Sequence, residues 1–283
     1  MQYDVVFMNP PYQAQVKRDS ADGGSGTGST LYDKFICKAF QLLVKSGFLC
    51  AVHPSKWRKP EDKLFREFQQ RCLFYLSIAN KQTGKKVFST TTRFDWYVLQ
   101  NLDKRHKTLI LDENGNDGEY DLKDWPFIPN FSFDILEKIL AKPGEKTCPV
   151  LYLGGAYDKR RPHMSDNQTD THIYPCVNST CKSGVRCYYS NTQSKGLFGI
   201  PKIIFGEADT IQNSIVDFDG EYAMTPCAIA VQIDSKHEGE QIKMALESQR
   251  FNDFLKACRW SNFRIEWRMF KYFRHDFWKE FIN

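Results

Sequence analysis

The residues best suited to chemistry lie near the start of the sequence, where Asn9-Pro10-Pro11-Tyr12 follows the apolar run at Tyr3–Met8. The exocyclic amine of adenine is a poor nucleophile, because its lone pair is delocalised into the ring. An Asn side-chain oxygen and a neighbouring main-chain carbonyl can accept both amine hydrogens, and a stiff Pro-Pro step holds that carbonyl at low entropic cost. Tyr12 offers a face on which the base can stack. The four residues therefore predict a clamp for a base that has been flipped out of its duplex.

Strands and helices alternate around this motif, which places it at the carboxyl end of a strand, where open α/β sheets bind ligands. We predict a buried strand at Tyr3–Met8, a Gly- and Ser-rich loop over 20–30, a helix over 31–45 capped by Gly47, a strand over 48–52 closed by Pro54, a helix over 61–72, a strand over 73–78, and a hairpin formed by 86–88 and 94–99. This order implies a parallel α/β sheet with an antiparallel edge, one half of a doubly wound (Rossmann-like) domain.

The pattern changes after residue 101, and we place a domain boundary so that residues 1–124 and 125–283 form separate regions. The second region is expected to be mixed α+β. The expected elements are a hairpin over 107–111 and 119–122, a helix over 133–140, short strands and turns from 150, helices over 238–246 and 252–257, and a helix over about 264–281. The aromatic residues of this last helix, Trp267, Phe270 and Phe277, are expected to pack inward together with Phe263 at its start.

The order of these motifs resembles one family. The NPPY strand is followed by the Gly-rich loop, then by Leu31-Tyr32-Asp33-Lys34-Phe35, Gly47-Phe48-Leu49, Pro54-Ser55-Lys56-Trp57, Lys86-Val87-Phe88 and Asp95-Trp96-Tyr97-Val98-Leu99. This series resembles the adenine-N6 DNA methyltransferases of restriction–modification systems, in particular the type IIG-like enzymes. The resemblance is strong over residues 1–101. It is weak beyond them, where Phe198-Gly199-Ile200-Pro201-Lys202 and Asp219-Gly220-Glu221-Tyr222 are similar to target-recognition regions.

The resemblance implies roles for several residues. Asn9, Pro10, Pro11 and Tyr12 would form the catalytic clamp, and Phe88 would stack on the flipped adenine opposite Tyr12. Pro54, Ser55 and Lys56 would line the same cleft. From the residues alone, Phe88 is equally consistent with a core aromatic side chain and Lys56 with a solvated surface charge.

S-adenosylmethionine is the methyl donor that the resemblance implies, but its usual Gly-rich strand–loop–helix turn does not precede the NPPY strand. The downstream candidates at 153–156 and 196–199 are not followed by a clear amphipathic helix and are better explained as turns. The cofactor-binding residues are therefore unknown. The sequence is equally consistent with a fragment, with one subunit of a split enzyme whose second chain supplies the cofactor-binding half, and with a degenerate enzyme.

Double-stranded DNA is the expected partner. The 39 Lys and Arg residues exceed the 34 Asp and Glu residues, which suits a polyanion without proving one. Lys85 and Lys86 lie near the predicted cleft, and Lys159-Arg160-Arg161 forms the densest basic run. Such a run is usually a solvated face, but it is also suited to contacts with phosphates and guanine.

No signal peptide and no apolar run long enough to cross a membrane are visible, so we expect a cytoplasmic protein in a bacterial, phage or viral setting. The nine cysteines are then expected to be reduced. Cys176, Cys181 and Cys187, with His172 and Cys148 nearby, leave a zinc knuckle open, although their spacing does not match paired C-x-x-C sites. The chemistry itself needs no metal, and we expect none.

Two alternatives remain open. The chain could be a non-catalytic DNA-binding specificity module that retains NPPY, or it could methylate another amine, in RNA adenine, protein glutamine or cytosine N4. The large second region favours the reading of a long duplex over a small substrate, and Asn at position 9 favours adenine over cytosine.

Overall fold

The computed structural model describes residues 2–13, 30–103, 106–260 and 264–282. The chain divides into two compact units, Met1–Phe131 and Ser132–Asn283, so the division falls seven residues after the predicted boundary. The predicted Gly- and Ser-rich loop lies, apart from Thr30, outside the described residues. None of the described helices is long and apolar enough to span a membrane.

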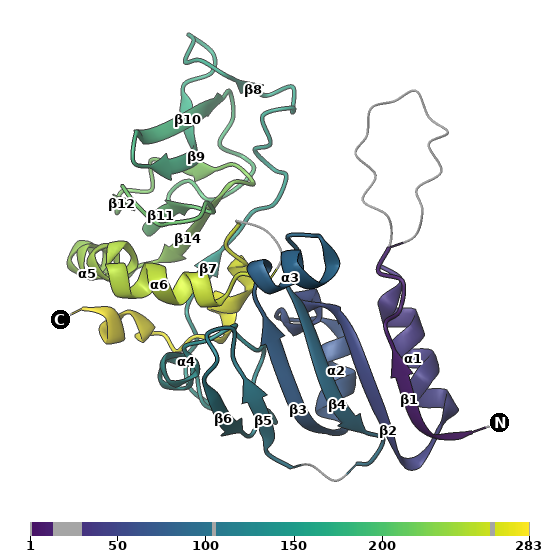
Figure 1. Cartoon of the computed structure of the whole chain (residues 1–283). Coiled ribbons are helices and arrows are strands. Elements are labelled where there is room, and N and C mark those ends of the chain that lie inside the picture. Colours follow the sequence, from purple (N-terminus) through teal and green to yellow (C-terminus); the bar gives the residue numbers. More distant parts are fainter. Residues whose placement is uncertain (1, 14–29, 104–105, 261–263, 283) are drawn as a thin grey trace, which may run out of the picture. The chain divides into compact units, whose positions relative to one another are not determined.

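The first unit is built on a six-stranded mixed sheet (Figure 1). Its elements, in chain order, are β1 (Tyr3–Met8), α1 (Tyr32–Leu42), β2 (Leu43–Pro54), the 3-10 helix η1 (Ser55–Arg58), α2 (Lys63–Gln69), β3 (Cys72–Ala79), α3 (Lys81–Phe88), β4 (Phe94–Gln100), β5 (Thr108–Leu111) and β6 (Asp117–Tyr120). The strand order is β1-β2-β4-β3-β5-β6. The β1–β2 and β3–β5 pairs are parallel, whereas β4 runs antiparallel to both of its neighbours and β6 is antiparallel to β5.

The two predictions about the hairpin over 86–99 were wrong. The antiparallel strand β4 lies in the interior of the sheet, between β2 and β3, and not at its edge. The predicted hairpin is absent from this described stretch, because residues 81–88 form α3. The Asn80 side chain caps that helix by accepting the Thr83 N–H at 2.9 Å, and Ser89 ends it in the left-handed conformation.

The predicted helix over 31–45 ends earlier, at Leu42, and the cap at Gly47 was wrong. Leu43 pairs with Tyr3, so the main chain enters β2 at once. Gly47 lies within that strand. A Cβ at Gly47 would lie 3.0 Å from the Asp4 carbonyl oxygen, so the glycine permits the close approach of β1.

One face of the sheet is covered and the other is open. On the covered face, β2 and β4 direct Leu49, Tyr97 and Leu99, all fully buried, toward the side that α1 and α2 occupy (Figure 1). On the opposite face, Val5 and Trp96 are each 44% exposed and Phe7 is 78% exposed. The prediction that Tyr3–Met8 is buried was therefore wrong. Among the described residues β1 pairs only with β2, and no described helix packs on its outer face.

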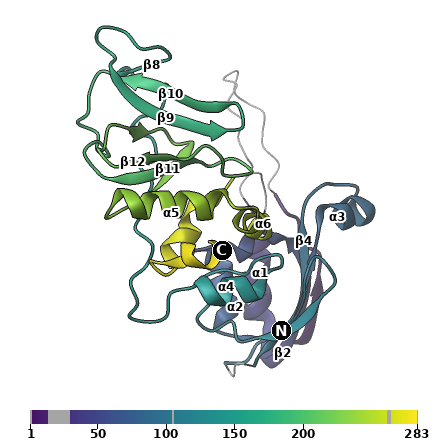
Figure 2. The same ribbon diagram turned by 90° about the vertical axis from the view of Figure 1, so that its left-hand side faces the viewer.

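The second unit contains two four-stranded sheets, ordered β13-β9-β10-β8 and β12-β11-β14-β7, which lie one above the other in Figure 2. Its elements are α4 (Phe133–Ile139), β7 (Val150–Leu151), β8 (Met164–Ser165), β9 (Tyr174–Cys181), β10 (Gly184–Ser190), β11 (Lys202–Gly206), β12 (Ile215–Asp217), β13 (Ala223–Met224), β14 (Ala228–Gln232), α5 (Lys236–Glu247), α6 (Gln249–Ala257) and the 3-10 helices η2 (Trp267–Tyr272) and η3 (Phe277–Phe281). The helix α5 packs against β11 and β12.

The predicted helix over 264–281 was wrong. Two short 3-10 helices replace it, because Phe273 and Arg274 form β-bridges to Leu140 and Thr147 and so interrupt the helical main chain. Phe270 and Phe277 are buried, as expected for packing residues, while Phe263 lies outside the described residues. The helices predicted near 133–140, 238–246 and 252–257 and the hairpin β5–β6 are confirmed.

Candidate functional site

The NPPY motif lies at the carboxyl end of β1 and is accessible to solvent. Asn9 and Pro11 are exposed, Tyr12 is half-buried and Pro10 is buried. The Tyr12 hydroxyl donates a 2.8 Å hydrogen bond to Asn9 Oδ1. The Tyr12 carbonyl accepts the Leu31 N–H at 3.1 Å, which anchors the motif just before α1. Burial raises the pKa of the Tyr12 hydroxyl, so this group remains a proton donor at neutral pH.

An open cleft of about 560 Å³ lies beside Asn9 on the uncovered face of the sheet. Its lining comes from three adjacent strands: Phe7, Met8 and Asn9 from β1 and its end, Cys50 to Val52 from β2, and Trp96 to Val98 from β4. The volume falls within the range of ligand pockets. Asn9 supplies the polar group, and the other walls are mainly apolar.

A second open cleft, of about 550 Å³, adjoins the first, because Val52 and Trp96 line both. It extends to Phe88, at the end of α3, whose ring meets that of Phe94 edge to face at 4.8 Å. Asn80, Asp112 and Glu113 also border it. The structure thus places Asn9 and Phe88 in adjoining clefts with a shared wall.

The three residues at 54–56 that were predicted to line the cleft differ in their exposure to solvent. Pro54 is half-buried, Ser55 is only 1% exposed and Lys56 is exposed. None of them lines the two clefts described above. The predicted DNA contacts Lys85 and Lys86 are exposed in the last turn of α3.

A buried polar network beneath the sheet, which the sequence analysis missed, supports the ends of β2 and β4. Asp95 accepts hydrogen bonds of 2.7 Å from both Trp57 and Arg58. The Arg58 guanidinium also donates to the carbonyls of Ile128 and Pro129 and to the Asn130 side chain. Arg58 and Asp95 are both 0% exposed. The network fixes η1, and with it the segment that carries Ser55 and Lys56.

His53 lies next to this network. Its ring stacks on Tyr32 at 4.4 Å, and its Nε2 lies 3.1 Å from the Tyr97 hydroxyl. Complete burial lowers the pKa of His53 to about 4, so the ring is neutral at physiological pH. The local sequence Pro-Ser-Lys-Trp-Arg that follows His53 does not predict this network, because the residues that bind Trp57 and Arg58 lie at positions 95 and 128–130.

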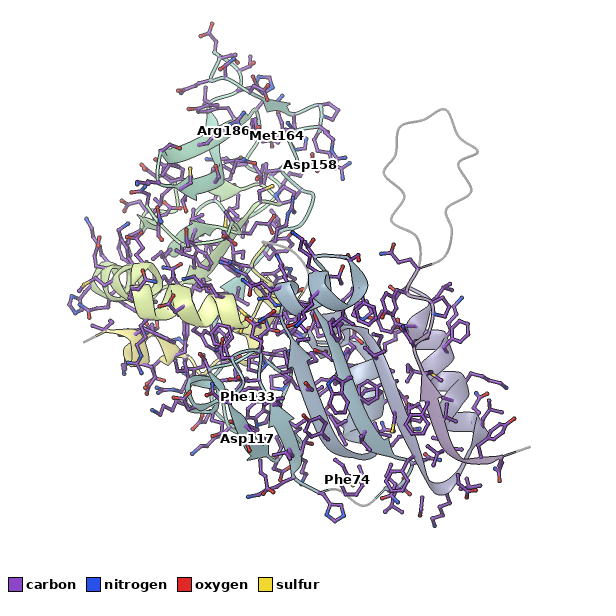
Figure 3. The ribbon with its side chains drawn as sticks, viewed as in Figure 1. Phe74, Asp117, Phe133, Asp158, Met164 and Arg186 are labelled. Atoms are coloured by element: carbon purple, nitrogen blue, oxygen red, sulfur yellow. The ribbon has the colours of Figure 1, made fainter. Side chains whose placement is uncertain are left out.

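The basic run at 159–161 lies in a turn of the second unit, in the region that carries β8–β10; Figure 3 labels Asp158 and Arg186 in this region. Arg160 is paired with Asp158 through two hydrogen bonds of 2.9 and 2.7 Å. This pairing lowers the pKa of the Asp158 carboxyl. Lys159 and the exposed Arg186 both approach the ring of Tyr188, at 5.9 and 5.1 Å. Arg186 is a candidate that the sequence analysis missed, since it stands alone in a strand.

The cysteines predicted as an alternative zinc site do not gather as a set, although Cys187 packs against the core cluster that contains Cys176. All nine are free thiols. Cys176 is buried in β9, whereas the thiol of Cys181 is held by Ser183 and Gly184 at the β9–β10 turn. In the part of the chain that the structure describes, no group of three metal-ligating side chains contains a cysteine.

A buried ion pair holds together the two segments that are similar to target-recognition regions. Lys202, which is 0% exposed, donates to Asp217 at 2.6 Å and to the carbonyls of Leu197 and Ile200. Asp217 also accepts the N–H groups of Glu221 and Tyr222. The two loops therefore share one buried ion pair.

Residues 1–88 match the family model described as Eco57I restriction-modification methylase. No curated protein sequence matches the chain. Among solved structures, the chain is similar to the type IIL restriction-modification enzyme MmeI in complex with DNA, with 9% identity over 92% of this chain and 44% of that one and a TM-score of 0.48. It is also similar to a chain of a type I restriction-modification system, with 13% identity over 38% of this chain and 23% of that one and a TM-score of 0.30. The chain thus spans less than half the length of either.

Proposed function

We propose that the chain is the catalytic-cleft and target-recognition part of a site-specific DNA methyltransferase that acts on the N6 amine of adenine. The observation that carries this proposal is the solvent-exposed Asn9 at the tip of β1, beside an open cleft and hydrogen-bonded to Tyr12. The match of residues 1–88 to a restriction-modification methylase model supports the same class of reaction.

In this proposal Asn9 and Pro10 hold the amine of a flipped adenine. The Asn9 side-chain oxygen has two lone pairs, so it can accept one amine hydrogen while it keeps the hydrogen bond from Tyr12. The Pro10 carbonyl accepts the second hydrogen. With both hydrogens held, the nitrogen lone pair is freed from the ring and can attack a methyl sulfonium in line, without a covalent enzyme intermediate. The S–CH3 bond breaks as the N–CH3 bond forms, the donor leaves as a neutral thioether, and the nitrogen then loses one proton to solvent. The ring of Tyr12 stacks on the base, and Phe88 closes the adjoining cleft from the opposite side.

S-adenosylmethionine is the proposed methyl donor, as a cosubstrate, but its usual Gly-rich strand–loop–helix turn is not found among the described residues. The Gly-rich stretches at 153–156 and 196–199 lie in turns of the second unit, and no helix follows either of them directly. Gly154, Gly196 and Gly199 all have positive φ, as turn glycines do. The donor site must therefore come from residues other than these.

We accordingly propose that a partner segment, in a second chain or in another part of a longer polypeptide, supplies the donor site. Two features support it. The main chain of β1 offers hydrogen bonds along an edge that none of the described strands uses. The apolar face that includes Val5, Phe7 and Trp96 is of the kind that helices cover in parallel α/β sheets.

We propose separate DNA contacts in each unit: Lys159, Arg160, Arg161 and Arg186 in the second unit, where Lys159 and Arg186 approach Tyr188, and Lys85 and Lys86 in the first. Arg160 would have to exchange Asp158 for a phosphate, so Lys159 and Arg186 are expected to contribute more. Log affinity falls as log salt concentration rises, and each phosphate contact that is lost makes this negative slope less steep by roughly 0.9.

A non-catalytic specificity module is the second candidate, because the donor site is missing from the described residues. The two are separated by purifying the chain with any co-purifying partner and measuring its binding to duplex DNA and, by calorimetry, to S-adenosylmethionine. The enzyme proposal expects donor binding in the presence of the partner and methyl transfer into unmethylated DNA. DNA binding with neither donor binding nor transfer under either condition identifies the module.

A further inference from the structure

Three potential metal ligands, unused by the proposed function, meet in the second unit. Asp234 directly precedes the N-cap of α5, Glu238 lies in the first turn of that helix, and His275 lies between η2 and η3. One ligand atom from each side chain lies within 4.8 Å of the other two. Asp234 is exposed, and the other two are half-buried.

The local structure holds these donors in place. The Ser235 side chain caps α5 by accepting the Glu238 N–H, and the Glu238 carboxylate accepts the Asp234 N–H at 2.7 Å. That hydrogen bond is made by Glu238 Oε2. The His275 N–H is bound to the Lys146 carbonyl at 2.8 Å, and Arg274 beside it donates to the Lys138 carbonyl. The helix α5 packs against η3, so the two segments are already in contact.

The three side chains do not satisfy one another. Within the described residues, no ion pair or hydrogen bond joins the His275 ring to either carboxylate. Two carboxylates this close also repel each other when ionised, and a cation bound between them would offset that repulsion. Ligands bonded to one ion at about 2.0–2.2 Å lie roughly 3–4 Å apart, so small side-chain rotations would close the observed spacing around a single ion.

We propose that Asp234, Glu238 and His275 bind a divalent transition-metal ion, with water in the remaining positions. An imidazole nitrogen with two carboxylate oxygens is a ligand set typical of zinc and its neighbours, whereas Mg²⁺ and Ca²⁺ prefer oxygen alone. The ion links the start of α5 to the C-terminal segment 264–282. It is independent of the proposed methyl transfer, which uses no metal. No sequence pattern predicts this site, because position 275 lies far from the other two.

The test uses the full chain after removal of metals with a chelator, titrated with zinc chloride in a calorimeter and, separately, with cobalt chloride in a spectrophotometer. We expect one ion per chain, visible cobalt absorption bands and a rise in the unfolding temperature with zinc. Asp234→Asn and His275→Gln should each weaken binding by more than the roughly tenfold loss that outer-shell changes cause.

His237→Ala is the matched control, because His237 is exposed in the same helical turn but is not one of the three ligands. It should bind zinc as the parent does. Because Asp234 is exposed, Asp234→Asn is expected to fold normally, so a loss of binding in that variant cannot be ascribed to unfolding. The proposal is overturned if the parent chain binds no zinc, or if His237→Ala weakens binding as much as His275→Gln.

Discussion

The two units bury their apolar strands to very different degrees. In the second unit, β11 and β14 are buried along almost their whole length: Ile203, Ile204, Phe205, Ile229 and Ala230 are all 0% exposed. In the first unit, β1 has an equally apolar sequence, yet Phe7 is 78% exposed. The comparison shows that an apolar run predicts a strand suited to burial. It does not predict which polypeptide segment packs on that strand.

The largest expected effect contrasts these strands directly. Phe205→Ala should lower the free energy of unfolding of the second unit by about 3–5 kcal/mol, because it leaves a cavity against Phe270. Phe7→Ala should change the stability of the first unit by less than about 0.5 kcal/mol, because its ring is already in water. Urea denaturation of the two variants measures both values. A cost for Phe7→Ala near that of Phe205→Ala would mean that the face of β1 is covered in the isolated chain.

The second prediction concerns the buried pair of Arg58 and Asp95. Asp95→Ala should destabilise the first unit by about 3–5 kcal/mol, because it leaves the Arg58 charge buried without its partner. Asp253→Ala is the control in the second unit. It breaks an exposed pair with Lys256 and should cost less than about 1 kcal/mol. Equal midpoints in chemical denaturation for the two variants would contradict the description of the network.

The third prediction is a pH dependence that belongs to the first unit. The pKa of His53 is about 4 in the fold against 6.5 in the unfolded chain, because burial disfavours the imidazolium. The contribution of neutral His53 to the free energy of unfolding is therefore complete above pH 6.5 and is lost as the pH falls toward 4. The loss is at most about 3 kcal/mol. Asp62 acts in the opposite direction over much of this window, because burial raises its pKa to about 6.

The measurement for His53 is therefore a difference between the parent chain and His53→Gln, taken at pH 7.5, 5.5 and 4.5, which cancels the contribution of Asp62. The stability advantage of the parent should shrink at each step toward acid. An advantage that is constant with pH would show that His53 titrates normally.

The fourth prediction concerns the close approach of the loops that carry Gly199 and Gly220 in the second unit. Gly220 has φ +70°, and a Cβ there would lie 2.5 Å from Gly199 Cα. Gly220→Ala should cost roughly 2 kcal/mol or more, since conformational strain adds to a main-chain collision. Gly115 also has positive φ but has free space around its Cβ position, so Gly115→Ala should cost only about 1 kcal/mol. Similar unfolding temperatures for the two variants would exclude the collision.

Local signals in the sequence predicted much of the fold. Apolar runs located β1, β2 and β3, Asn-Gly and Asp-Gly pairs located the β5–β6 hairpin, and periodicity located α5 and α6. Two of the failures came where distant residues decide, and one came from a local helix cap that was overlooked. Pairing of Leu43 with Tyr3 shortened α1, the Asn80 cap turned an expected strand into α3, and bridges at Phe273 and Arg274 divided an expected helix.

The candidate site was predictable to the same extent. Asn9 and Tyr12 belong to one contiguous motif and are hydrogen-bonded to each other, and Asn9 lines an open cleft. Phe88 was predicted in a hairpin and lies instead on a helix, yet it borders the adjoining cleft. Arg186 and the network of Arg58 and Asp95 gave no signal, because their neighbours in space are remote in sequence.

The most direct test of the account is to identify the methylated nucleoside by mass spectrometry in DNA from cells that express the chain from its own locus, beside cells that express Asn9→Ala. Because Asn9 is exposed, the variant should fold as the parent does. The account predicts N6-methyladenine with the parent chain and a loss of roughly 10²–10³-fold in the initial rate with the variant. N6-methyladenine at equal rates in both strains, or N4-methylcytosine in place of it, would contradict the proposed role of Asn9.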